Sequence, residues 1–181
     1  MRRLCDDMVT RVGRLRHVDM DRVAVGFSQA RKASPFGMYA SLTPMRFAGG
    51  ALHTVRRGRK WGVQRLYDAS GREMLYILNF YLPRFLDLPL REKLTTVVHE
   101  LWHIGPQFDG DVRRFGGRCF AHGASQKRYD TQVETLLRRW LADEPAESVW
   151  AFLRDDFREL TTRHGHVHGR KFPSPKLIPV Q

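Results

Sequence analysis

The residues from His99 to His103, "HELWH", set two histidines four positions apart and place a glutamate directly after the first. On a helix, side chains at i and i+4 stand one above the other, so both imidazoles can reach one metal ion. Glu100 is rotated by about 100° from His99, which keeps its carboxylate off the ion but within reach of a metal-bound water. Zinc lowers the pKa of such a water to about 7, and a glutamate can accept its proton while the metal polarises a carbonyl. The spacing therefore predicts a hydrolytic Zn²⁺ site with Glu100 as general base.

A catalytic zinc ion needs a third protein ligand, and the sequence offers three classes of candidate. His122 follows a glycine-rich loop and precedes an amphipathic helix that would hold it in place. Asp109 lies six residues after His103, where metzincins carry their third ligand, but Pro106 replaces the glycine of that pattern. A carboxylate on the following helix, Glu134 or Asp130, would give a gluzincin-type site. We prefer His122 as the third ligand and keep Asp109 and Glu134 as alternatives.

The apolar residues around the motif predict the helix that must carry it. They fall within about 80° on a helical wheel, and the two histidines lie on the opposite side: Leu90, Leu94, Val97, Leu101 and Ile104. Asp87 is a plausible N-cap, Pro89 suits a first turn, and Gly105-Pro106 ends the pattern. We therefore expect a helix over 88–104 with separate core and histidine faces.

The segments on either side of this helix indicate an α+β fold. Strand-like patterns occur within the first 82 residues, among them Val23 to Arg31 and the continuous apolar run Met74 to Tyr81, which suits a buried strand. Helical periodicity returns over about 125–142 and again near the C-terminus. We expect a small mixed sheet packed on the histidine-bearing helix, in one domain over 1–163, followed by a basic tail rich in histidine and proline over 164–181.

The chain is strongly basic, with a formal net charge of +12 and a pI near 10.5. Its clustered cations could contact a phosphate backbone: Arg56, Arg57, Arg59 and Lys60; Arg113, Arg114 and Arg118; Arg138 and Arg139. Nucleic acid is therefore a possible partner besides a peptide or protein substrate. The alternative function from another class is a basic nucleic-acid-associated protein whose zinc is structural or vestigial.

Cysteine content and hydropathy bear on the compartment. Cys5 and Cys119 are too few for a disulfide framework, which fits a reducing environment. No apolar run approaches the roughly 18 residues of a membrane span, and charges interrupt the N-terminal segment where a secretory signal would be apolar. The expected location is cytoplasmic, without membrane association.

The segment Leu94 to Gly123, "LTTVVHELWHIGPQFDGDVRRFGGRCFAHG", resembles the small phage-type metallopeptidases and, more distantly, the SprT-like proteases. The resemblance covers about residues 74–140 and implies a compact zincin fold. It makes His99, His103 and His122 the zinc ligands and Glu100 the catalytic base of a metallopeptidase. By the same resemblance an extended peptide substrate pairs with an edge strand, which would be Leu75 to Tyr81 or a nearby strand.

The sequence also departs from the SprT-like pattern. Those chains commonly carry an aromatic residue four positions after the third histidine, whereas this chain has Gln126, with Tyr129 the nearest aromatic. The cysteines of a downstream zinc ribbon are absent from the sequence. Both departures weaken the link to DNA-associated proteolysis.

Overall fold

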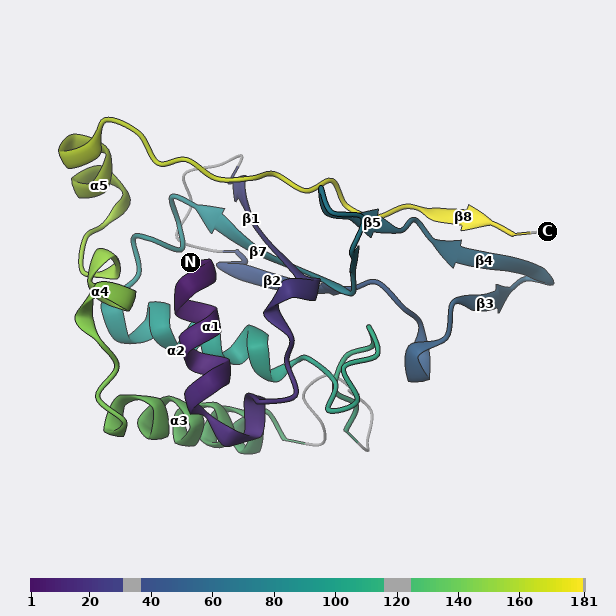
Figure 1. Cartoon of the computed structure of the whole chain (residues 1–181), viewed down its shortest axis with the longest axis horizontal. Helices are drawn as coiled ribbons and strands as arrows, with labels where there is room; N and C mark the ends of the chain where they lie inside the picture. Colours follow the sequence, from purple (N-terminus) through teal and green to yellow (C-terminus); the bar gives the residue numbers. More distant parts are fainter. Residues whose placement is uncertain (31–36, 116–124, 181) are drawn as a thin grey trace.

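The computed structural model of this chain describes residues 1–30, 37–115 and 125–180. A three-stranded sheet in the order β1-β7-β2 lies beside a group of helices, which confirms the α+β prediction (Figure 1). The sheet consists of β1 (Val23–Gln29), β7 (Tyr76–Leu82) and β2 (Ala40–Pro44). The helices are α1 (Arg2–Arg11), α2 (Leu90–Trp102), α3 (Gln126–Ala142), α4 (Glu147–Trp150) and α5 (Phe157–His164).

β7 is the middle strand of this sheet, parallel to β1 and antiparallel to β2. The prediction that Leu75 to Tyr81 could act as a peptide-pairing edge is therefore wrong, because β7 uses both of its edges within the sheet. β2 is the nearby strand that lies at an edge. Its position follows from the sequence: a run that is apolar on both faces belongs in the centre of a sheet, whereas the shorter and more polar "ASLTP" tolerates an edge.

The main core lies between this sheet and the helices. Strand alternation directs Tyr76, Leu78 and Phe80 of β7 toward the helices, and all three are fully buried. The apolar stripe predicted for α2 is buried against them, which confirms the separate core face of this helix. α2 begins at Leu90 after Pro89, and Asp87 is not its N-cap; the Asp87 carboxylate instead accepts the N–H of Phe157, at 3.3 Å.

The C-terminal helices are tied back to α2 by a buried lysine. The Lys93 ammonium donates hydrogen bonds to the carbonyl oxygens of Leu153 and Asp155, at 2.9 and 2.8 Å. Burial lowers the pKa of Lys93, and the charge is kept because these oxygens replace its water. The N-terminal part of α2 is thus fixed before the helix reaches the histidines.

A second, three-stranded sheet extends away from this body at the right of Figure 1. It consists of β3 (His53–Arg56), β4 (Arg59–Val63) and β8 (Leu177–Pro179), in the order β3-β4-β8. We call this sheet the basic arm. The short pair β5 (Leu66–Tyr67) and β6 (Glu73–Met74) connects it to the body.

The segment after α5, predicted as a basic tail, contacts both sheets. The Phe27 N–H of β1 donates to the Arg170 carbonyl at 2.8 Å, and β8 pairs with β4. Phe172 packs so closely on Gly26 that a Cβ at that glycine would lie 2.7 Å from the ring. Within the described residues, no helix combines the length and apolar character needed to cross a bilayer.

Candidate metal centre

The two motif histidines converge at the C-terminal end of α2. Their Nε2 atoms lie 3.1 Å apart, and the ring centroids are separated by 4.8 Å. Two nitrogens that bind one zinc ion tetrahedrally, each at about 2.0–2.1 Å, stand about 3.3 Å apart. Both side chains are half-buried. The donor atoms of His99 and His103 thus have the separation that a shared zinc ion requires.

Glu100 occupies the side of α2 that faces the edge strand β2. Its side chain is buried, with 8% of the residue exposed. Burial raises the pKa of Glu100 from its ordinary value near 4.5 to about 7, and a hydrogen bond with the Leu42 backbone opposes that rise. A cation held by the neighbouring histidines would also favour the ionised carboxylate. The C-terminal end of α2 therefore presents two imidazoles toward one point, with a carboxylate beside them.

The contact with Leu42 follows from the pairing pattern of β2. Tyr81 and Met45 donate N–H bonds across the β2–β7 pair, to the carbonyls of Tyr39 and Leu75, at 2.9 and 3.0 Å. Since bonded positions alternate along an antiparallel strand, Ala40 and Leu42 direct their N–H and C=O groups away from β7. No other strand of the described residues pairs with this edge. Glu100 therefore lies where an extended chain could bind beside the histidines.

Tyr129 of α3 contacts the imidazole rings of both histidines. Its ring stacks on His103, with centroids 5.1 Å apart at 28°, and meets His99 edge-on at 4.9 Å. Its hydroxyl donates to the His99 carbonyl at 3.1 Å. Burial, followed by the negative charge of Glu100, raises the pKa of Tyr129, so the phenol stays protonated and remains a donor. Because this hydroxyl is bonded to backbone, the contact supports a role in positioning the rings.

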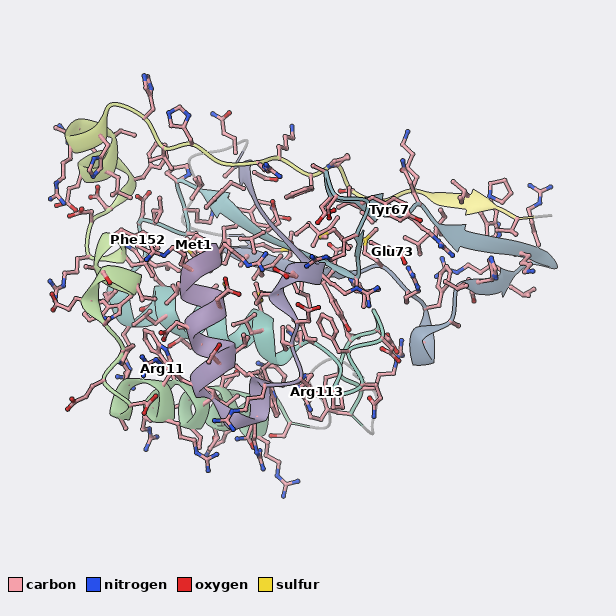
Figure 2. All side chains as sticks on the ribbon, viewed as in Figure 1. Met1, Arg11, Tyr67, Glu73, Arg113 and Phe152 are labelled. Atoms are coloured by element: carbon pink, nitrogen blue, oxygen red, sulfur yellow. The ribbon has the colours of Figure 1, made fainter. Side chains whose placement is uncertain are left out.

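Arg113, in the loop after α2, bonds backbone carbonyls at the C-terminal end of that helix. The Arg113 N–H donates to the His103 carbonyl at 2.6 Å, and the Arg113 Nε donates to the Trp102 carbonyl at 2.9 Å. The guanidinium lies 3.6 Å from the centroid of the Trp102 ring. A cation at a helix C-terminus is favourable for the dipole and satisfies carbonyls that lack intrahelical donors. In Figure 2 the Arg113 label marks this loop, below the end of α2.

Asp111 connects the same loop to the segment after β2. It is 5% exposed, and its carboxylate accepts the Gly49 N–H at 2.9 Å and two bonds from Arg114, at 2.7 and 2.9 Å. Arg46 adds a backbone bond to Gly110, at 3.0 Å. The strand beside Glu100 and the loop beyond His103 are thus held together by a buried, fully bonded carboxylate.

Asp109 and Glu134, the alternative third ligands, both lie among the described residues. The Asp109 carboxylate accepts the Asp111 N–H at 3.0 Å and packs on Gly50, while Glu134 pairs with Arg91 and Arg138 on the surface. Across the described residues, no group of three or more His, Cys, Asp or Glu side chains is placed to hold a metal ion. Neither Asp109 nor Glu134 therefore joins the histidine pair. His122 lies outside the described residues and stays a prediction.

The positioning residues of this site were not predicted from the sequence. Tyr129 was named above only as the aromatic nearest to an unmatched position, although it also begins the apolar stripe of α3, which continues through Val133, Leu136, Leu137 and Trp140. That stripe indicates that Tyr129 faces α2. No signal within the sequence indicates that Leu42 would bond Glu100, since the contact depends on strand pairing.

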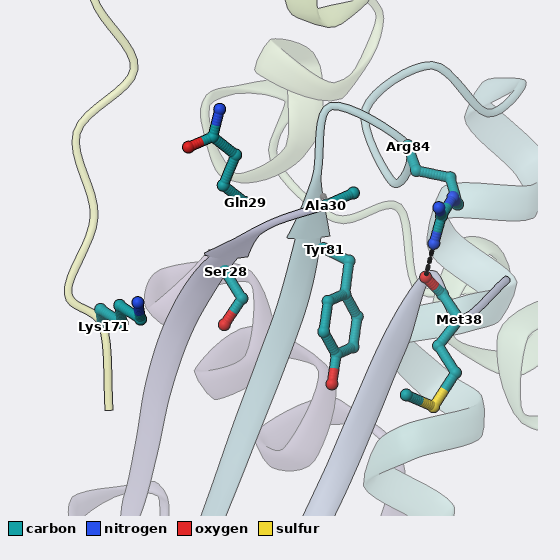
Figure 3. Close-up of a pocket in the computed structure, with 7 residues that line it drawn as sticks. All are labelled: Ser28, Gln29, Ala30, Met38, Tyr81, Arg84 and Lys171. Atoms are coloured by element: carbon teal, nitrogen blue, oxygen red, sulfur yellow. Dashed lines mark hydrogen bonds between the residues drawn. The ribbon is translucent and has the colours of Figure 1, made fainter. Parts of the chain in front are cut away.

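A separate pocket lies at the carboxyl ends of β1 and β7, with a volume of about 790 Å³ (Figure 3). Its lining comprises Ser28, Gln29, Ala30, Met38, Tyr81, Arg84 and Lys171. Ser28 and Tyr81 alternate with Phe27 and Phe80, whose rings contribute to the core on the helical side. The pocket therefore opens on the face of the sheet opposite α2 and contains no residue of the metal centre.

Comparisons of the chain with protein-family models, with curated proteins and with solved structures gave no significant match. Function is therefore inferred from the geometry of the site.

Proposed function

We propose that this chain is a zinc-dependent metallopeptidase whose active site is formed by His99, Glu100 and His103 at the C-terminal end of α2. The observation that carries the proposal is the 3.1 Å separation of the two Nε2 atoms, next to a carboxylate that is buried against an edge strand. A structural zinc site has no use for an unliganded glutamate in this place, whereas a hydrolase needs one.

The two histidines would hold the zinc ion, and His122 is the proposed third ligand. The bound ion would lower the pKa of water and polarise the substrate carbonyl. Tyr129 and Arg113 keep the rings and the helix end in position through their bonds to the His99 and His103 carbonyls. Such outer contacts fix the direction of the donor nitrogens before the ion binds.

Glu100 would move the proton. Its carboxylate accepts the proton of the attacking water and then donates it to the amine that leaves when the peptide bond breaks. Burial raises the pKa of Glu100 to about 7 against the opposing hydrogen bond from Leu42. A cation held by the histidines would favour the ionised carboxylate, which is the form that accepts the proton.

The substrate would be an extended peptide that pairs with β2. Ala40 and the Leu42 carbonyl offer backbone groups on the open edge, and Pro44 at the end of the strand has no N–H to offer. Main-chain pairing supplies affinity with little sequence selectivity. The zincin-type fold that the resemblance implies is part of the same proposal.

The experiment that tests this function compares Glu100→Gln with Glu134→Gln, a control that removes a surface carboxylate paired with Arg91 and Arg138. Purified variants are loaded with one equivalent of zinc and assayed on casein and on a fluorescence-quenched peptide mixture. We expect Glu100→Gln to keep its zinc and to lose hydrolysis by about 10³-fold or more, and Glu134→Gln to match the parent.

The same pair of variants tests the alternative, a nucleic-acid-associated protein with structural zinc. If the parent shows no zinc-dependent hydrolysis on any peptide, or if Glu100→Gln cleaves as well as Glu134→Gln, the peptidase proposal is wrong. The basic arm is the feature that favours a nucleic-acid partner.

A further inference from the structure

The net positive charge of this chain comes from two stretches of sequence. Residues 22–67 and 160–181 contain no aspartate or glutamate but hold 13 of the 31 lysines and arginines. The remaining residues carry 18 lysines and arginines against all 19 acidic residues, so they are nearly neutral. The net charge of +12 thus comes from the segments that build β1 and β2, the basic arm and the C-terminal strand.

Within these stretches the cations concentrate at the tip of the basic arm. Arg56, Arg57, Arg59 and Lys60 are all exposed, and among the described residues none of them forms an ion pair. Glu73 lies at the base of the arm (Figure 2), where it pairs with Arg46 at 2.7 Å and with Arg65 at 3.5 Å. The charge of the tip is therefore not compensated locally.

The turn at the tip holds an arginine, Arg57, in an unfavourable backbone conformation. β3 and β4 are joined by Arg57 and Gly58, both with positive φ, of 51° and 72°. Tight hairpins of this kind prefer asparagine or glycine at the first of these positions. Arginine in the left-handed region costs about 1–2 kcal/mol, so the turn sequence does not maximise folding stability.

One face of the arm combines these cations with an aromatic ring. Pairing of Arg56 with Arg59, of Thr54 with Trp61 and of Val63 with Leu177 places the three pairs on one face, since side chains alternate along each strand. Arg56, Arg57, Arg59, Trp61 and Leu177 line a hollow of about 520 Å³ on this face. Cations beside a ring and an aliphatic wall match a phosphate with its adjoining base and sugar.

We propose that the basic arm is a nucleic-acid-binding element in which the arginines of the tip contact phosphates and Trp61 stacks on a base. An anionic membrane is the competing partner, because Val55 and Ile178 are exposed on the arm. A hairpin that inserts into lipid carries its apolar residues at the tip, whereas here the tip is "RRGRK" and the apolar residues lie behind it. The arm shares no residue with the metal centre, so its binding is independent of the proposed peptidase activity.

The test is fluorescence polarisation of labelled oligonucleotides of about 20 residues, single-stranded and duplex, with the full-length chain over a range of salt. The arm variant replaces Arg56, Arg59 and Lys60 by glutamine and Arg57 by asparagine, which tolerates positive φ. A matched control removes the same four charges from exposed positions of the helical body, with glutamine in place of Arg3, Arg16, Arg139 and Arg158.

We expect the arm variant to bind at least tenfold more weakly than the parent, with a salt slope smaller by about 3, and the control to stay within about threefold. Trp61→Leu should weaken binding of the single strand more than binding of the duplex, because only unstacked bases reach the ring. Circular dichroism verifies that each variant is folded.

Three results would overturn the proposal. The parent could fail to bind either oligonucleotide at physiological salt. The arm and control variants could lose affinity equally, which would mean that net charge alone acts. Vesicles containing phosphatidylserine could bind through the arm while the oligonucleotides do not.

Discussion

The helical body, which comprises the helices and the β1-β7-β2 sheet, differs from the basic arm in charge balance and in packing. In the body, the residues outside 22–67 and 160–181 have nearly balanced charges, the ends of α2 are bonded, and the site residues are held by neighbours such as Tyr129 and Asp111. In the arm, acidic residues are absent, aliphatic side chains are exposed, and the turn adopts a costly conformation. The contrast teaches that the two regions are suited to different tasks: a fixed geometry for chemistry, and an uncompensated surface for binding.

The largest effect should come from breaking the metal centre alone. His103→Ala removes one of the two convergent nitrogens, so we expect loss of stoichiometric zinc and a fall of peptide hydrolysis to background. Oligonucleotide affinity should stay within about twofold of the parent, because the arm does not depend on the ion. Zinc analysis and fluorescence polarisation on the same preparation check both halves of this prediction. A parallel loss of both activities in a folded variant would contradict the separation of the regions.

The next effect concerns stability, which should depend on the body and not on the arm. Leu101→Ala empties a position that is 0% exposed, and we expect it to lower the free energy of unfolding by about 2–5 kcal/mol. Val55→Ala truncates a side chain that is 70% exposed on β3, and its effect should stay within about 0.5 kcal/mol. Urea unfolding followed by circular dichroism measures both. Equal losses would show that the arm forms part of the cooperative core.

Tyr129→Phe tests whether the contacts around the histidines contribute to metal binding. The ring contacts with both histidines remain, but the bond from the hydroxyl to the His99 carbonyl is lost. Removal of an outer contact of this kind commonly weakens metal binding by 10–100-fold, and we expect the lower end of that range because stacking persists. Competition with a chromophoric chelator measures the affinity, and Tyr67→Phe, at an exposed position, is the control. Unchanged affinity in Tyr129→Phe would remove this residue from the site.

The smallest effect belongs to the turn of the arm. Arg57→Gly relieves the positive φ at this position and should stabilise the hairpin by about 1 kcal/mol. Gly58→Ala imposes the opposite strain at φ 72° and should destabilise it. Hydrogen exchange of the β3 and β4 amides should slow by several-fold in the first variant and accelerate in the second. The same direction of change in both would contradict the described turn.

Local patterns in the sequence predicted the elements that carry the site, and pairing between distant segments decided the rest. The apolar stripe of α2 and the helix over about 125–142 were confirmed, because each depends on periodicity within one segment. The buried strand expected over Met74 to Tyr81 was confirmed with shifted bounds, as β7 over Tyr76–Leu82, while Met74 belongs to β6. Of the two options given for the peptide-pairing edge, Leu75–Tyr81 was wrong and a nearby strand, β2, does lie at an edge. The continuous apolar run of Leu75–Tyr81 is itself typical of a central strand.

The missed contacts join residues far apart in the chain. Tyr129 reaches His99 across 30 positions, and Asp111 reaches Gly49 across 62. Asp87 is of a residue type that commonly caps helix N-termini, but its carboxylate accepts the N–H of Phe157, which lies 70 positions further along the chain. The convergence of His99 and His103 could be predicted because a spacing of four residues places both side chains on one side of a helix. The choice among His122, Asp109 and Glu134 depends on how distant segments pack, so the sequence leaves it open.

X-ray absorption at the zinc K-edge, on the full-length chain supplied with one equivalent of zinc, tests the central claim most directly. The account predicts one bound ion with nitrogen ligands at about 2.0–2.1 Å, lost in His99→Ala and His103→Ala and retained in Glu100→Gln. Failure of the parent to bind zinc, or a zinc spectrum that both histidine variants leave unchanged, would contradict it.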